Sequence, residues 1–153
     1  MIFVSFGNSP RLFIRLAQAV DNLAKILNEE VIVQNGFTQY PFKHCKCIPF
    51  IEQSSYKAYL QNCSIAILQG GWGGISEASD LGCRIVVVPR KNGEEHYHDQ
   101  EQLVKELEKK GICLGCYDTH KLPLIVEKAR NYEFKPLQRG SAASIINQFI
   151  ESI

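Results

Sequence analysis

Four glycines fall within five residues in the middle of the chain, in the segment Gly70-Gly71-Trp72-Gly73-Gly74. They follow an apolar run, 65–68, and precede a segment of helical pattern, 75–81, with Glu77 in its expected first turn. A strand that leads through a glycine turn into a helix exposes backbone N–H groups at the positive end of the helix dipole. Glycine also tolerates φ > 0 and lets a ligand approach the backbone closely. The segment therefore predicts a phosphate or diphosphate site; a turn that serves only tight packing is the alternative.

Short apolar runs alternate with helical patterns along the whole chain. The expected strands are 1–6, 30–34, 46–50, 65–68, 84–88 and 112–114, and the expected helices are 10–27, 52–61, 75–81, 98–110, 119–129 and a last one that begins at Ser141. Apolar strands that alternate with helices predict one α/β domain, 1–153, with a Rossmann-like parallel sheet and helices on both faces. Ligands bind such sheets at the carboxyl ends of the strands, near a switch in strand order. Gly7-Asn8, Gln69–Gly74 and Arg90–Gln100 are expected to meet there.

Composition excludes several classes of function. With 45% hydrophobic and 22% charged residues among 153, the chain is expected to be globular rather than disordered. A net charge of +1 offers no basic field for nucleic acid. No apolar run approaches the ~20 residues of a membrane span, and the N-terminus lacks the basic flank and cleavage site of a signal peptide. We therefore expect a cytoplasmic protein without a membrane span of its own.

The six cysteines are expected to be reduced in such a compartment. Those that sit among apolar neighbours, where a thiol acts as a small hydrophobe, are Cys63, Cys83 and Cys113. Cys45 with Cys47, and Cys113 with Cys116, have the spacing of zinc half-sites. No companion histidine spacing supports them, so we expect no metal.

The segment 93–100 contains two histidines and three acids and has three interpretations. It is a solvated loop that caps the next helix, with Asp99 in the early turn, or a set of hydrogen-bonding groups for a sugar. A metal site is the third interpretation, although no third ligand stands at a suitable spacing from the two histidines. For a sugar, Gln100 offers donor and acceptor, and Asp99 or Glu95 accepts from hydroxyls. Trp72 could stack on a base or sugar, cover the turn, or contact a partner. No Ser-His-Asp or Cys-His arrangement follows from spacing, so no catalytic residue is predicted.

Four segments together carry a family resemblance: 1–7, the glycine segment with Glu77, 85–90, and Glu95-His96 with Asp99-Gln100. In this order, over residues 1–115, they resemble the C-terminal half of the family 28 glycosyltransferases. That family includes the peptidoglycan glycosyltransferase MurG, the donor-binding subunit of the chitobiosyl-lipid synthase, and bacterial exopolysaccharide subunits of the PssE type. The chain length is similar to that of the short stand-alone subunits.

The resemblance implies the C-terminal half of a GT-B fold that binds a UDP-sugar, often UDP-GlcNAc, and transfers the sugar without a metal or other cofactor to a lipid-linked or polysaccharide acceptor. It places the glycine segment on the diphosphate, Glu77 on the ribose hydroxyls and Gln100 on the sugar. The residues expected to bind the donor are Gly7, Asn8, Gly70, Gly71, Trp72, Gly73, Gly74, Glu77, Arg90, Glu95, His96, Asp99 and Gln100.

The resemblance also implies a partner, a membrane-associated acceptor-binding subunit of the PssD type that carries the catalytic base and recruits this chain to the inner face of the membrane. The expected last helix could dock on that partner or complete the core. The chain departs from the family at Gln69, where His or Arg is usual, at Trp72, where a small residue is usual, and at Gly74, where Ser or Thr is usual. These departures support a rival hypothesis, a non-catalytic donor domain that scaffolds a glycosyltransferase. A UDP-sugar epimerase is disfavoured, because 153 residues hold one half of such a cleft.

Overall fold

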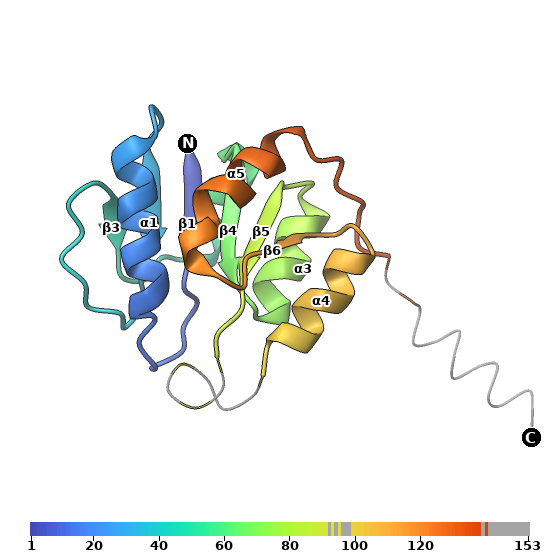
Figure 1. Cartoon of the computed structure of the whole chain (residues 1–153), viewed down its shortest axis with the longest axis horizontal. Coiled ribbons are helices and arrows are strands. Elements are labelled where there is room, and N and C mark those ends of the chain that lie inside the picture. Colours follow the sequence, from blue (N-terminus) through green and yellow to red (C-terminus); the bar gives the residue numbers. More distant parts are fainter. Residues whose placement is uncertain (92, 94, 96–98, 139, 141–153) are drawn as a thin grey trace, which may run out of the picture.

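The computed structural model describes residues 1–91, 93, 95, 99–138 and 140, and these form a single six-stranded sheet with helices on both faces (Figure 1). The strands are β1 (Ile2–Ser5), β2 (Val31–Gln34), β3 (Lys46–Ile48), β4 (Ile65–Gln69), β5 (Ile85–Val88) and β6 (Leu114–Gly115). The helices are α1 (Ile14–Ile26), α2 (Gln53–Asn62), α3 (Trp72–Asp80), α4 (Glu101–Lys109), the 3-10 turn η1 (Thr119–Lys121) and α5 (Leu122–Asn131). The predicted α/β fold with a parallel sheet is confirmed.

All neighbouring strands pair in parallel, in the order β3-β2-β1-β4-β5-β6. Because successive side chains of a strand point to opposite faces, the continuous apolar runs supply two cores at once. Ile2 and Val4 of β1 face the core beneath α1 and α5, whereas Phe3 faces the core beneath α2, α3 and α4. The strand order reverses between β1 and β4, so loops that leave these two strands diverge and leave room for a ligand at their carboxyl ends.

Helix α3 begins at Trp72, three residues earlier than the apolar pattern predicts. Gly73 and Gly74 therefore lie in its first turn rather than in a loop, and Glu77 lies in the second turn, so the expected first-turn acid is wrong. None of the four clustered glycines has a positive φ. Left-handed backbone therefore does not account for these glycines; the close neighbours of Gly70, Gly71 and Gly74 account for those three, as described below.

Other element bounds shift in the same way. Helix α1 starts at Ile14 rather than near Pro10, and Leu12 lies before it, 49% exposed. Helix α4 starts at Glu101 rather than at residue 98, and the segment 119–129 divides into η1 and α5. The expected helix from Ser141 lies outside the described residues. Within the described ranges, every helix is too short or too polar to cross a bilayer.

Candidate functional site

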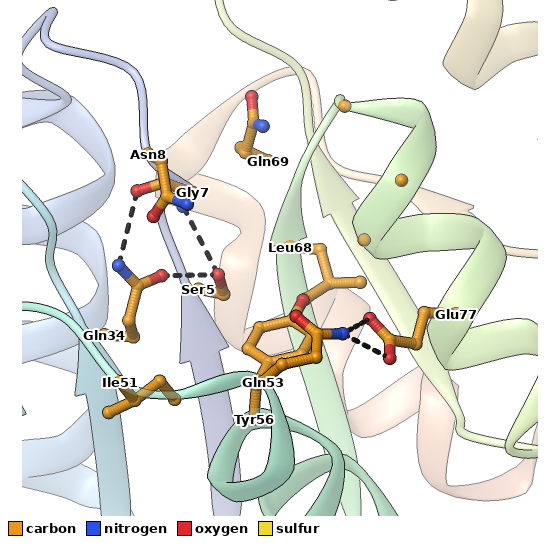
Figure 2. Close-up of a pocket in the computed structure, with 13 residues that line it drawn as sticks. Ser5, Gly7, Asn8, Gln34, Ile51, Gln53, Tyr56, Leu68, Gln69 and Glu77 are labelled. Atoms are coloured by element: carbon orange, nitrogen blue, oxygen red, sulfur yellow. Dashed lines mark hydrogen bonds between the residues drawn. The ribbon is translucent and has the colours of Figure 1, made fainter.

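A cavity of about 310 Å³ opens at the carboxyl ends of β1 and β4, where the strand order reverses (Figure 2). It is lined by Ser5, Gly7, Asn8, Gln34, Ile51, Gln53, Tyr56, Leu68, Gln69, Gly71, Gly73, Gly74 and Glu77. Glu77 is the one charged side chain among these described lining residues. Two of the three segments expected to meet, Gly7-Asn8 and Gln69–Gly74, do meet here. No described residue of the third, 90–100, lines the cavity, but Gln100 of that segment hydrogen-bonds Gly70 and Gln69.

The N-terminus of α3 faces this cavity through Gly71, Gly73 and Gly74. Gly71 is the N-cap residue, with extended backbone at φ −82° and ψ 132°, and no side chain caps the helix. The first N–H groups of an α-helix have no partner within the helix and carry the positive end of its dipole. The arrangement therefore presents hydrogen-bond donors and partial positive charge to anything bound in the cavity.

A chain of hydrogen bonds fixes the loop that leaves β1. The Ser5 hydroxyl donates to Gln34 Oε1 at 2.7 Å, and Gln34 Nε2 donates to the carbonyls of Gly7 at 3.3 Å and Pro49 at 3.0 Å. The Gly7 N–H in turn donates to Ser5 Oγ at 3.3 Å (Figure 2). Gly36, at φ +53°, passes so close that a Cβ on it would lie 2.7 Å from the Gly7 carbonyl oxygen. The floor of the cavity is thus preformed by side chains at the ends of β1 and β2.

Glu77 lies at the side of the cavity, between α3 and α2. Both of its carboxylate oxygens accept from Gln53 Nε2, at 2.7 and 2.9 Å (Figure 2). Lys57 Nζ lies 3.8 Å from Glu77 Oε1. The side chain is 22% exposed, so it is accessible to a ligand while its position is fixed by α2. Such a carboxylate accepts hydrogen bonds from vicinal hydroxyls.

Tyr56 of α2 lies beside the first turn of α3. A Cβ on Gly74 would lie 3.1 Å from the Tyr56 hydroxyl oxygen, so the glycine leaves room for this hydroxyl. Burial raises the pKa of Tyr56 to about 12. The hydroxyl is therefore neutral at physiological pH and can donate a hydrogen bond into the cavity.

The side chain of Gln69 lies over Gly7 and Gly71. Cβ atoms on these glycines would lie 2.9 Å and 2.4 Å from Gln69 Nε2, closer than real Cβ atoms approach. A Cβ on Gly70 would lie 2.8 Å from the Gln100 side chain, whereas one on Gly73 would meet nothing within 4 Å. Close approach of neighbouring side chains accounts for Gly70 and Gly71.

Gln100 is buried and connects three segments. Its Oε1 accepts from the backbone N–H of Gly70 at 3.1 Å and of Arg90 at 2.8 Å, and its Nε2 donates to Gln69 Oε1 at 3.0 Å. Because both acceptor sites of Oε1 are engaged, the amide in this arrangement holds the glycine segment against the end of β5. The contact with a sugar that the resemblance implies for Gln100 stays a prediction.

Arg90 is fully buried, at 1% exposure, and does not line the cavity. Its guanidinium donates to backbone carbonyls of both loops at this edge of the sheet and lies 4.4 Å from the ring centre of Phe13. The acceptors are Phe6 at 3.0 Å, Arg11 at 3.0 Å, Leu12 at 3.3 Å and Glu95 at 3.2 Å. Burial lowers the pKa of Arg90 to about 10, so it stays charged at neutral pH. Arg90 therefore joins the loop after β1 to the loop after β5.

The described residues among the remaining expected donor residues do not line the cavity. Glu95 pairs with Arg15 at 2.9 Å, and its Oε2 accepts from the Lys91 N–H at 2.7 Å. The Asp99 carboxylate accepts from the Glu101 N–H at 2.8 Å and lies before α4 rather than in its first turn. Trp72 is half exposed, at 50%, on the first residue of α3. His96 lies outside the described residues.

Several lining residues were not predicted: Ser5, Gln34, Ile51, Gln53, Tyr56 and Leu68. Gln69 was expected at this edge only as part of the segment Gln69–Gly74, without a role in donor binding. Gln34 and Gln69 each follow an apolar run as the last residue of a strand, and a polar residue at that position is a signal that sequence reasoning could have used. Gln53 and Tyr56 are three residues apart on α2, on one helix face. Within the described ranges, no three His, Cys, Asp or Glu side chains cluster closely enough to hold a metal ion.

A parallel sheet with a cavity at its switch point defines a Rossmann-like domain that binds ligands at the carboxyl edge. The chain matches the glycosyltransferase family 28 C-terminal domain over residues 1–153 and belongs to that family. No curated protein matches it.

Solved glycosyltransferases share the fold. The glycotransferase of kitacinnamycin is 18% identical over 85% of this chain, with a TM-score of 0.66. SnogD from Streptomyces nogalater is 18% identical over 99%, with a TM-score of 0.58. VinC, solved in complex with dTDP, is 14% identical over 85%, with a TM-score of 0.58. The alignments cover 34%, 43% and 33% of those chains, so the present chain spans less than half of each.

Proposed function

We propose that this chain is the donor-binding domain of a glycosyltransferase and that the cavity at the ends of β1 and β4 binds the UDP moiety of a UDP-sugar. One observation carries the proposal: the uncapped N-terminus of α3 and the Glu77 carboxylate line the same cavity. The first is suited to a diphosphate, the second to a ribose diol. VinC, whose structure contains dTDP, supports binding of a nucleoside diphosphate by this fold.

In the proposed reaction an acceptor hydroxyl attacks the anomeric carbon directly and inverts its configuration, while the sugar–phosphate bond breaks and UDP leaves. Negative charge then develops on the β-phosphate. The N–H groups at Gly73 and Gly74, with the Tyr56 hydroxyl beside them, would stabilise that charge without reorganisation. No metal is required in this scheme, because helix N–H donors supply the stabilisation.

The catalytic base and the acceptor site are proposed to come from a second polypeptide. The solved glycosyltransferases are more than twice as long as the segment that they share with this chain. We propose a membrane-associated acceptor-binding subunit of the PssD type, with a lipid-linked or polysaccharide acceptor at the inner face of the membrane. GlcNAc or another hexose is the proposed sugar.

A second candidate function is a non-catalytic donor domain that scaffolds its partner. The position of Gln69 favours this alternative, since its side chain lies over Gly7 and Gly71 beside the proposed diphosphate position. Turnover by the reconstituted pair that survives Glu77→Ala would support the scaffold.

Titration calorimetry with UDP, UDP-GlcNAc and UDP-glucose tests the donor site. Hydrogen bonds to a charged group contribute about 1.5–3 kcal/mol, so Glu77→Ala should weaken UDP binding about tenfold or more. The matched control is Glu133→Ala, at an exposed glutamate outside the cavity lining. Trp72, the single tryptophan, stands at the start of α3 and gives an independent fluorescence readout. Absence of uridine nucleotide binding, with and without a partner, would reject the proposal.

A further inference from the structure

A second cavity of about 310 Å³ lies at the opposite edge of the sheet, at the amino ends of β4 and β5. Its walls include Cys63, Ser64, Cys83 and Arg84, with Tyr132 beside them. Two cysteines that the sequence predicts only as small hydrophobes therefore share one cavity. Cys83 is 9% exposed and Cys63 is partly exposed, so the pair can be reached from solvent through Cys63.

The two thiols converge on one backbone atom. Cys63 Sγ and Cys83 Sγ each donate to the carbonyl oxygen of Leu60, both at 3.2 Å. Neither sulfur is in a disulfide. Two sulfurs that each lie 3.2 Å from one oxygen are at most twice that distance from each other.

The strand register places the two backbones at a compatible separation. Ala66 of β4 pairs with Ile85 of β5, and the Ala66 N–H donates to the Arg84 carbonyl at 2.9 Å. Cys63 and Cys83 each stand two residues before one of these two paired strands, whose spacing is ~4.8 Å. Disulfides span Cα separations of about 4.4–6.8 Å.

The thiols also differ in reactivity. The neighbouring Cys83 side chain lowers the pKa of the Cys63 thiol, and the neighbouring Cys63 side chain together with burial raises the pKa of Cys83. The more exposed thiol is therefore the one with more thiolate, and the thiolate is the nucleophile in exchange. Such an asymmetry gives one attacking and one resolving cysteine.

We propose that Cys63 and Cys83 form a thiol–disulfide exchange site that reacts with low-molecular-weight disulfides and closes to an intramolecular disulfide. The Cys63 thiolate attacks one sulfur of the small disulfide, forms a mixed disulfide and releases one small thiolate. Cys83 then attacks the Cys63 sulfur, the mixed disulfide breaks, and the second small thiolate leaves. The two protons of the cysteines pass to the two released thiolates, so two protein thiols and one small disulfide yield one protein disulfide and two small thiols.

The bond would join the ends of two helices that carry the nucleotide cavity. Cys63 is the C-cap of α2, which carries Gln53 and Tyr56, and Cys83 follows the turn after α3, which carries Glu77. The site is independent of the proposed function, because its formation is a covalent change that is measured without any nucleotide.

The test uses the full chain, reduced and then incubated with oxidised glutathione. Intact mass spectrometry should show a loss of two hydrogens, and peptide mapping should place the link between Cys63 and Cys83. The oxidised chain should melt about 5 °C higher than the reduced chain, since the link constrains the unfolded state. Cys63→Ser and Cys83→Ser should each abolish the link, whereas Cys47→Ser, at an exposed cysteine, should not.

Three results would overturn the proposal: no mass change in the wild-type chain, a link that maps to other cysteines, or a stable glutathione adduct at Cys63 that never closes. Because the decisive mapping is made on the wild-type chain, it does not depend on the folding of the serine variants.

Discussion

The Gln100 side-chain oxygen accepts a hydrogen bond from the Gly70 backbone N–H, 3.1 Å away, and thereby ties the glycine segment to the start of α4. The same oxygen accepts from the Arg90 N–H. Gln100, which was expected to contact a sugar, therefore also stabilises the fold, and this contribution to stability can be measured without any ligand.

Gln100→Ala should lower the free energy of unfolding by about 2–4 kcal/mol, because two buried backbone N–H groups lose their acceptor. Gln100→Glu keeps the acceptor oxygens but loses the donor to Gln69 Oε1 and buries a carboxylate, so it should recover only part of that loss. Gln102→Ala, at an exposed glutamine of α4, is the control and should change stability little. Urea unfolding measures all three. Equal stability of Gln100→Ala and the control would contradict the bridging role.

Arg90→Lys should lower the free energy of unfolding by about 2–4 kcal/mol, even though the charge is kept. A lysine ammonium cannot reach the four carbonyls that the guanidinium contacts, and it leaves the face of Phe13. Arg84→Lys, at an exposed arginine, is the matched control. Calorimetric melting curves of the two variants test this prediction. If Arg90→Lys lowers the free energy of unfolding by less than about 1 kcal/mol, Arg90 does not hold the two loops together as described.

Stability should fall in acid partly through Glu95. Burial opposes the charged form, but hydrogen bonds from Arg15 and the Lys91 N–H outweigh it and lower the pKa of Glu95. A carboxyl with a lowered folded pKa contributes stability above its unfolded pKa of about 4.3, and that contribution disappears as the pH falls through the folded pKa. Glu95→Gln should cost about 1–2 kcal/mol at pH 7 and much less at pH 3.

Urea unfolding at both pH values checks the Glu95 prediction, with the exposed Glu133→Gln as control. A cost that is the same at pH 7 and pH 3 would show that the Arg15–Glu95 contact adds no pH-dependent stability.

The glycines in the first turn of α3 should differ in their tolerance of a methyl group. Gly73→Ala should stabilise the chain by about 0.5–1 kcal/mol, because alanine favours helix and nothing lies within 4 Å of its Cβ. Gly74→Ala should gain less, since its Cβ would lie 3.1 Å from the Tyr56 hydroxyl. In a Tyr56→Phe background the two alanines should become equivalent. Thermal melts of this double-mutant cycle give the answer, and an unchanged difference after Tyr56→Phe would exclude Tyr56 as the cause.

The sequence predicts the sheet well, because buried parallel strands need continuous apolar residues and the chain has them, as in 85–88. It predicts helix starts less well. Gly73 and Gly74 are poor helix formers, so their place inside α3 depends on tertiary contacts rather than on propensity.

The site was predicted only in part, because tertiary packing decides which side chains face the cavity. Among the residues expected to bind the donor, Gly7, Asn8, Gly71, Gly73, Gly74 and Glu77 line the cavity, and their contact with a donor stays a prediction. Arg90 was expected beside the donor and is buried instead, because composition does not reveal whether an arginine faces a ligand or backbone carbonyls. Gln53 and Tyr56 come from a helix whose angle to the sheet no local pattern specifies.

One consequence follows from the cavity lining, in which the described residues include no lysine or arginine. An anion held there would depend on N–H dipoles at short range, not on a field that extends into solvent. Raising the ionic strength, which screens exposed charges over about 10 Å at 0.1 M, should then cost little affinity, and encounter with the nucleotide should gain little from electrostatic steering.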